Sequence, residues 1–197
     1  NVSRKNQNLA FYEIGRVFQQ ENDPKHDLPQ EEKHLALALT GELLTKDWQT
    51  ASVKVDFFSV KGILENVFAK FGVAEQITYE KSNLKDLHPG RSAAIFLGEE
   101  QIGFIGQVHP KVAKAYDLPE TYVAEVNLAA LLAAQVAPLV YQTVSKFPAV
   151  KRDIALLVAD TVTNRELMTV IKDSAGKYLT DITLFDVYQG QNIEDGH

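Results

Sequence analysis

The sequence contains no cysteine, one tryptophan and one methionine among its 197 residues. Without thiols the chain has no disulfide framework, no thiolate zinc site and no cysteine nucleophile. It also has no apolar run near the ~20 residues that span a bilayer, and Asn1–Lys5 does not resemble the start of a signal peptide. We therefore expect a cytoplasmic protein without membrane contact.

The sequence patterns of common catalytic and metal sites are missing as well. No two of the five histidines have the i, i+4 spacing of an HExxH site, and neither a Gly-x-Ser-x-Gly elbow nor a Gly-x-x-x-x-Gly-Lys-Ser/Thr loop occurs. The net charge of −6 excludes a protein whose whole surface is basic. Any contact with RNA must therefore be local.

The overall composition is that of a soluble globular protein, with 45% hydrophobic and 23% charged residues. A length of 197 residues predicts one full domain and part of a second, because domains usually have about 100–200 residues. The first residue is not Met, and the sequence stops in the turn-like run Asp195–His197. We expect both ends to be cuts within a longer protein.

The first third of the chain predicts strands followed by one strongly patterned helix. Residues typical of strands fill Leu9–Phe18, the polar run Glu21–Lys33 is typical of a loop, and alternating leucines predict a strand over His34–Thr40. Asp56 can cap a helix that Gly72 ends, with apolar residues at helical spacing between them.

The middle of the chain predicts a hairpin, a short helix, a strand and another helix. In order, the predicted elements are a turn at His88–Arg91, strands at Ala93–Leu97 and Ile102–Val108, a helix opened by Pro110, a strand at Tyr122–Val126 and a helix over Leu128–Gln135.

A break in periodicity over Ala137–Phe147 predicts a boundary between two domains, residues 1–140 and residues 141–197. Beyond the boundary the pattern predicts a strand, a helix and a long strand. These are Ile154–Val158, a helix capped by Thr163 and Glu166 with Leu167, Val170 and Ile171 inward and Gly176 at its end, and Tyr178–Tyr188.

Two features have both a functional and a structural interpretation. The glycines of Gly103–Gly106 are compatible with phosphate binding, but they lie within a predicted strand, where close backbone packing explains small residues. The cluster Lys146, Lys151 and Arg152 is either a solvated loop or a contact for RNA phosphates.

Several stretches resemble the β subunit of bacterial phenylalanyl-tRNA synthetases. In chain order they are Leu9–Phe18 with its core Phe-Tyr-Glu-Ile-Gly-Arg-Val-Phe, Asp56–Gly72, His88–Ala93, Ile105–Pro110 and Ser145–Ala155. They follow one another over essentially the whole chain, so the resemblance is more specific than any single motif. The last stretch resembles the opening of the family's ferredoxin-like anticodon-binding domain.

The resemblance implies an α+β fold, in which an N-terminally truncated class II aminoacyl-tRNA synthetase-like domain with an antiparallel sheet precedes a C-terminally truncated ferredoxin-like domain. It also implies a catalytic α subunit as partner in an α2β2 heterotetramer, and tRNA(Phe) as the RNA. An active class II site needs arginines for ATP. Ala124–Leu132 has neither glycine nor arginine, and Arg16 lacks its partners. We expect this chain to be non-catalytic and to bind no cofactor, whereas the whole enzyme uses ATP and magnesium.

Within the second domain, the resemblance implies that a later strand lies between the two predicted here. We therefore expect residues after about Phe147 to be poorly packed, rearranged or paired between chains. For RNA contacts the candidates are Lys146, Lys151 and Arg152 for phosphates and Tyr188 for stacking on a base. Two alternatives are a stand-alone ferredoxin-like module that binds a small molecule, and an active class II ligase.

Overall fold

The computed structural model describes residues 6–19, 29–136, 138, 140–141 and 143–188. The chain divides into two compact units, residues 1–140 and residues 141–197. Among the described residues, no helix has the length and apolar character needed to cross a membrane.

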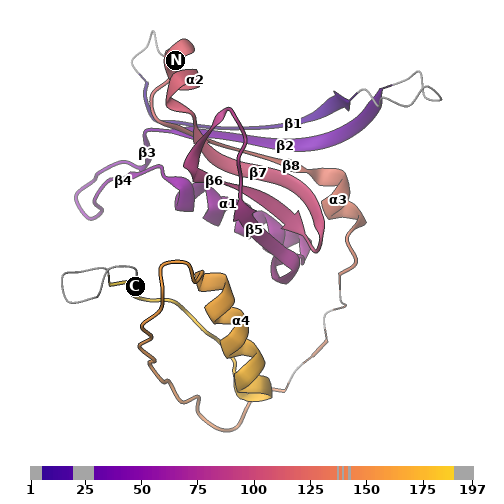
Figure 1. Cartoon of the computed structure of the whole chain (residues 1–197), viewed down its shortest axis with the longest axis vertical. Coiled ribbons are helices and arrows are strands. Elements are labelled where there is room, and N and C mark those ends of the chain that lie inside the picture. Colours follow the sequence, from indigo (N-terminus) through magenta and orange to yellow (C-terminus); the bar gives the residue numbers. More distant parts are fainter. Residues whose placement is uncertain (1–5, 20–28, 137, 139, 142, 189–197) are drawn as a thin grey trace. The chain divides into compact units, whose positions relative to one another are not determined.

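A six-stranded antiparallel sheet forms the framework of the first unit (Figure 1). Its strands, in sheet order, are β1 (Leu9–Gln19), β2 (Gln30–Thr40), β8 (Thr121–Asn127), β7 (Glu100–Val108), β6 (Leu87–Leu97) and β5 (Ile77–Lys81). Strand β8 lies between the β1–β2 hairpin and the β6–β7 hairpin and pairs with both. The β6–β7 hairpin is the one predicted from the sequence. A small ribbon of β3 (Glu42–Leu44) and β4 (Val53–Lys54) leads to the first helix. The prediction of a mixed fold with an antiparallel sheet is confirmed.

Helix α1 (Phe57–Phe71) has the two ends that the sequence predicts. The Asp56 side chain accepts a hydrogen bond from the Ser59 amide, and the Ser59 hydroxyl lies near the Asp56 amide, which completes a capping box. Gly72 ends the helix at φ 75°, a conformation that glycine adopts without steric cost. Val60, Leu64 and Phe68 lie on the fully buried side of α1.

The core lies between α1 and one face of the sheet. Because side chains alternate along a strand, Leu35 and Leu39 share this face with their neighbours Val126 and Tyr122. The other face carries the intervening residues. We call this other face the outer face; in its central strands it includes His34, Ala36, Ala38, Phe104, Val123 and Glu125.

Two further helices follow strands of the sheet: α2 follows β7, and α3 follows β8. Pro110 is the first residue of α2 (Pro110–Ala115), as predicted, and the His109 side chain caps it. Helix α3 (Leu128–Ala133) follows β8 directly and is shorter than the predicted span to Gln135. Asn127 caps α3 by accepting hydrogen bonds from the Ala129 and Ala130 amides. A 3-10 turn, η2 (Ala74–Gln76), precedes β5.

The structure has strands in two places where the sequence predicts a turn or a loop. His88–Arg91, predicted as a turn, lies within β6. Its ladder with β7 shifts register between Leu87 and Ser92, so Pro89 needs no regular hydrogen-bond partner there. Residues 30–33, predicted as loop, begin β2, because pairing with the end of β1 outweighs their polar composition. The rest of that predicted loop falls mainly on residues 20–28, outside the described residues.

The second unit contains one α-helix, α4 (Asn164–Ala175), and the 3-10 turn η3 (Gly176–Tyr178) among its described residues. The predicted capping box of Thr163 and Glu166 is present, and Gly176 ends the helix. Val170, predicted to face inward, is 63% exposed. Among the described residues of this unit, no strand packs against that side of α4.

The strands predicted over Ile154–Val158 and Tyr178–Tyr188 are absent from the described residues. A strand persists only where a neighbour satisfies its backbone groups, and neither segment has one there. Their apolar side chains are exposed, including Ile154, Leu156, Leu157, Leu184, Phe185 and Val187. Over residues 148–188, these exposed side chains agree with the first of the expected outcomes, poor packing.

Candidate functional site

A polar network crosses the outer face from β2 to β8. His34 Nδ1 lies 2.6 Å from Glu125 Oε1, and His34 Nε2 lies 3.2 Å from Glu32 Oε2. Asn127 Nδ2 donates to the same Glu32 oxygen at 2.7 Å, while its Oδ1 caps α3. Burial acts to lower the pKa of His34, but the hydrogen bonds to Glu125 and Glu32 outweigh it and raise the pKa. These groups satisfy one another, so the network ties two strands and a helix together.

A second polar network lies where two of the family-like stretches meet. Arg91 Nη1 donates to Gln107 Oε1 at 2.9 Å and lies 3.3 Å from Glu120 Oε1. The Tyr122 hydroxyl donates to the same Glu120 oxygen at 2.7 Å. Burial, followed by the hydrogen bond to Glu120, raises the pKa of Tyr122. The carboxylate of Glu120 thus links β6 to β8.

The glycines of β7 have a structural explanation. A Cβ added to Gly103 would lie 2.1 Å from the Glu125 carbonyl oxygen, and one added to Gly106 would lie 2.8 Å from Ser92 Cβ. Both positions sit inside the sheet with their neighbouring strands too close for a side chain. The interpretation of these glycines as close-packing residues is confirmed.

The first unit offers poor partners for ATP phosphates. Arg16 is paired with Glu31 across the β1–β2 hairpin. Residues 124–132, which form most of β8 and α3, supply neither an arginine nor a glycine. Arg16 therefore already has a carboxylate partner, and residues 124–132 contribute no arginine to a phosphate contact.

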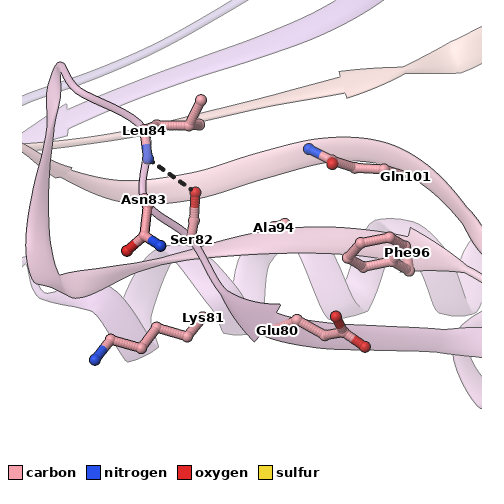
Figure 2. A pocket seen from close by; sticks show the side chains of 8 residues that line it. All are labelled: Glu80, Lys81, Ser82, Asn83, Leu84, Ala94, Phe96 and Gln101. Carbon is pink, nitrogen blue, oxygen red and sulfur yellow. Dashed lines mark hydrogen bonds between the residues drawn. The ribbon is translucent and has the colours of Figure 1, made fainter.

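A shallow depression of about 270 Å³ lies between β5, β6 and the loop that joins them. Figure 2 shows Lys81 and Glu80 extending away from each other, as expected for consecutive strand residues. The Ser82 hydroxyl accepts from the Leu84 amide, and the Ser82 carbonyl accepts from the Ser92 hydroxyl at 3.2 Å. These serines complete the loop rather than form a nucleophile with a base. No group of three potential metal ligands occurs in the described parts of the chain.

The predicted RNA contacts all lie in the second unit. Lys146, Lys151 and Arg152 are exposed in irregular segments, and Arg152 Nη1 donates to the Lys151 carbonyl at 3.4 Å. Tyr188 is 61% exposed. Lys151 and Arg152 are neighbours in the chain, but within the described residues no hydrogen bond or ring contact joins Tyr188 to the basic cluster.

Three groupings escaped prediction from the sequence. The pairing of His34 with Glu32 had a signal, because residues i and i+2 of a strand share a face. Glu125 as the partner of His34, and Glu120 as the partner of Arg91 and Tyr122, could be found only from the register of the strands. The third grouping is Lys177 with Tyr178, whose ring centroid lies 5.2 Å from the lysine Nζ at the end of α4. The sequence indicated this contact only by placing the two residues next to each other.

Comparison with known proteins identifies both parts of the chain. Residues 1–128 match the family model of the phenylalanyl tRNA synthetase beta chain CLM domain, and residues 145–197 match that of the ferredoxin-fold anticodon binding domain. Two solved structures of pyrrolysyl-tRNA synthetase from Desulfitobacterium hafniense align over 63% and 66% of this chain, and over 40% and 45% of their own. Their TM-scores are 0.42 and 0.44, at 16% and 13% identity. Scores at this level do not establish a common fold.

Curated relatives match over nearly the full chain. The identity is 53% over 194 residues with the phenylalanine–tRNA ligase beta subunit of Streptococcus pneumoniae, and 49% over 197 residues with that of Streptococcus agalactiae serotype V. The alignments cover 98% and 100% of this chain but 24% of each relative, so the chain spans about a quarter of their length. Together with the two family models, these matches show that the chain belongs to the family of phenylalanyl-tRNA synthetase β subunits.

Proposed function

We propose that this chain supports the assembly of phenylalanine–tRNA ligase and binds the anticodon region of tRNA(Phe) during ATP-dependent aminoacylation. The observation that carries the proposal is the order of the two family matches, β chain domain first and anticodon-binding domain second, over nearly the whole chain. This order favours the ligase over a stand-alone small-molecule-binding module. The setting of the reaction is the cytoplasm.

The first unit acts as a class II synthetase-like domain without catalysis of its own. Its antiparallel sheet supports this interpretation, as do the pairing of Arg16 with Glu31 and the lack of glycine and arginine over residues 124–132. The α subunit supplies the active site in an α2β2 heterotetramer, and ATP and magnesium act there.

Strand β1 supplies an assembly surface. It is the terminal strand of the sheet, and its side chains Phe11, Tyr12, Ile14 and Phe18 are 52–75% exposed. A long apolar edge strand is a costly surface to leave in water, and an added strand or an apolar partner removes that cost. Contact with another subunit is the role of β1 that fits a family of ligases with several subunits.

The second unit supplies a local RNA contact. Lys146, Lys151 and Arg152 are exposed and suit phosphate oxygens, which position an RNA without reading its sequence. The exposed ring of Tyr188 suits stacking on an unpaired anticodon base.

The assembly role is tested in a complete β chain produced together with its α subunit. We expect Tyr12→Glu combined with Ile14→Glu to reduce co-purification of α and aminoacylation in parallel. The matched control is Phe58→Glu, which charges a 74% exposed side chain on α1. Full assembly and charging by the β1 variant would refute an assembly role for this edge.

The RNA contact is tested with the triple variant Lys146→Gln, Lys151→Gln and Arg152→Gln. We expect weaker tRNA(Phe) binding, with a slope of log affinity against log salt that is shallower by about 0.7–0.9 for each phosphate that is no longer bound. The control triple variant Lys46→Gln, Lys85→Gln and Lys111→Gln makes the same charge change at exposed positions of the first unit. Equally weakened binding in both variants would indicate a general charge effect instead of a contact.

A further inference from the structure

His34 on β2 faces a carboxylate at each of its two ring nitrogens. Nδ1 lies 2.6 Å from Glu125 Oε1 on β8, and Nε2 lies 3.2 Å from Glu32 Oε2 on the same strand as the histidine. An ionised carboxylate only accepts hydrogen bonds, and a neutral imidazole has a single N–H to donate. Both contacts are therefore hydrogen bonds only while the ring carries two protons. The geometry of the site requires an imidazolium.

The environment of His34 is acidic. Its side chain is 14% exposed, and α3, which follows β8, contains no charged residue. Among the described residues, the charged groups on this part of the outer face are all carboxylates. They are Glu32 and Glu125, Glu13 on β1, and Glu100, which lines the same depression as Glu32. The cations at adjoining strand positions, Arg16 and Lys33, lie on the opposite face. The charge of the imidazolium is thus the one that balances these carboxylates.

Glu32 connects the histidine to the start of α3. Its Oε2 also accepts a hydrogen bond from Asn127 Nδ2 at 2.7 Å, and Asn127 Oδ1 accepts from the amides of Ala129 and Ala130 in the first turn of the helix. An N-cap side chain stabilises a helix only when its oxygen points at these amides. The contact with Glu32 fixes that orientation, because it holds the nitrogen of the same side-chain amide.

Loss of one proton from the ring acts on the Glu32 side. The remaining N–H stays with Glu125, the shorter contact, so the lone pair of Nε2 then faces the Glu32 carboxylate. These two acceptors repel each other, and the Glu32 side chain, which is 24% exposed, turns into water. Asn127 thereby loses the acceptor that orients it. Burial lowers the pKa of His34, but the contacts with the two carboxylates outweigh it and raise the pKa above 6.5. The change therefore occurs as the pH rises beyond that value.

We propose that His34, Glu32 and Asn127 form a pH-sensitive device that holds the first turn of α3 while the imidazole carries two protons and releases it when one proton leaves. Among the described elements, α3 is the last helix of the first unit, so the device acts where the chain leaves that unit. The other end of α3 has a separate contact, in which the Gln76 side chain donates to the Gln135 carbonyl at 3.1 Å. The release is therefore confined to the start of the helix.

The test measures amide hydrogen exchange by mass spectrometry in the complete β chain assembled with its α subunit, from about pH 6 to about pH 9. Protection factors correct for the intrinsic effect of pH on exchange. We expect protection over residues 128–133 to fall at least about threefold across this range, as for a weakened N-cap. The first turn of α1 is the internal control, because the hydrogen bond from Ser59 lowers the pKa of Asp56 and keeps that cap ionised throughout.

Three variants locate the effect. Asn127→Ser keeps a capping oxygen but has no amide to donate to Glu32, so the protection of α3 should no longer depend on pH. Glu32→Gln removes the carboxylate that repels the neutral ring and should also abolish the pH dependence. Glu13→Gln is the matched control, because it removes the same charge from the outer face at a position that pairs with Ala36 and not with His34. It should behave like the parent.

Each outcome decides the inference. Constant protection of α3 in the parent protein overturns it. A pH-dependent loss that persists in Asn127→Ser or in Glu32→Gln also overturns it, because the histidine would then act through other groups. If Glu13→Gln abolishes the pH dependence as fully as Glu32→Gln, the effect belongs to the general charge of this face and the specific contact is refuted.

Discussion

His34 on β2 and Glu125 on β8 are joined by a 2.6 Å contact between Nδ1 and Oε1, diagonally across paired strands. The same imidazole reaches Glu32, whose carboxylate accepts from the Asn127 side chain at the start of α3. One histidine therefore connects β2 to β8 directly and to α3 through a shared carboxylate.

This connection should depend on pH. The hydrogen bonds to Glu125 and Glu32 raise the folded-state pKa of His34 above its ordinary 6.5, so folding favours the protonated ring. The resulting stabilisation is complete below about pH 6.5 and is lost as the pH rises through the folded-state pKa. We expect His34→Gln to destabilise the protein most near pH 6 and least near pH 9, as measured by urea unfolding. A difference in unfolding free energy that stays constant over this range would contradict the prediction.

The capping box of α1 should make a measurable contribution. Replacing Asp56 with Ala removes the acceptor for the Ser59 amide and should lower the unfolding free energy by about 0.5–2 kcal/mol. Asp56→Asn retains a side-chain acceptor and should cost much less. Equal destabilisation by the two substitutions would show that the charge of Asp56, and not its hydrogen bond, matters at this helix end.

Two glycines should respond oppositely to alanine. At Gly103 the new methyl group would lie 2.1 Å from the backbone oxygen of Glu125, which cannot move without breaking the sheet, and we expect a destabilisation of about 1–3 kcal/mol or more. At Gly62, inside α1, an added Cβ meets nothing within 4 Å among the described residues. There alanine should stabilise by about 0.5–1 kcal/mol. Thermal unfolding of the two variants checks both signs, and a stable Gly103→Ala protein would disprove the close approach.

Tyr79, which is half-buried, and Tyr122, which is buried, should differ in the contribution that their hydroxyl groups make to stability. The Tyr79 hydroxyl is buried without a hydrogen-bond partner among the described residues, and burial raises its pKa strongly. Tyr79→Phe should therefore be neutral or stabilising. Tyr122→Phe removes the 2.7 Å hydrogen bond to Glu120 and should cost about 1 kcal/mol. Chemical denaturation compares them, and a larger destabilisation by Tyr79→Phe would mean that its hydroxyl has a partner.

Local signals in the sequence predicted much of the first unit. Helix α1 was predictable at both ends because Asp56 and Gly72 act on the backbone within one turn. The segment His88–Arg91 was not, since proline and glycine are typical of turns and only the shifted ladder with β7 shows that they lie in a strand. The strand prediction in the second unit was wrong for a different reason: Ile154–Val158 has the composition of a strand, but within the part of the unit that the structure describes no strand lies beside it.

The candidate sites were less predictable than the fold. The basic residues near Lys151 stand out in the sequence, because no acidic residue separates them. The network around His34 does not, since Glu125 lies 91 positions away and only the β2–β8 register brings it near. Side-chain pairs of this kind depend on long-range topology, which a single sequence does not reveal.

The two edges of the six-stranded sheet are unequal. Strand β1 has 11 residues and exposes the apolar side chains of Phe11, Tyr12, Ile14 and Phe18, whereas β5 has five residues and ends in Glu80 and Lys81, both exposed. A sheet with two receptive edges can add copies without limit and grow into a fibre. With one receptive edge it accepts a single neighbour and then stops. The short β5 edge with its exposed charges thus disfavours growth of the sheet in its own direction.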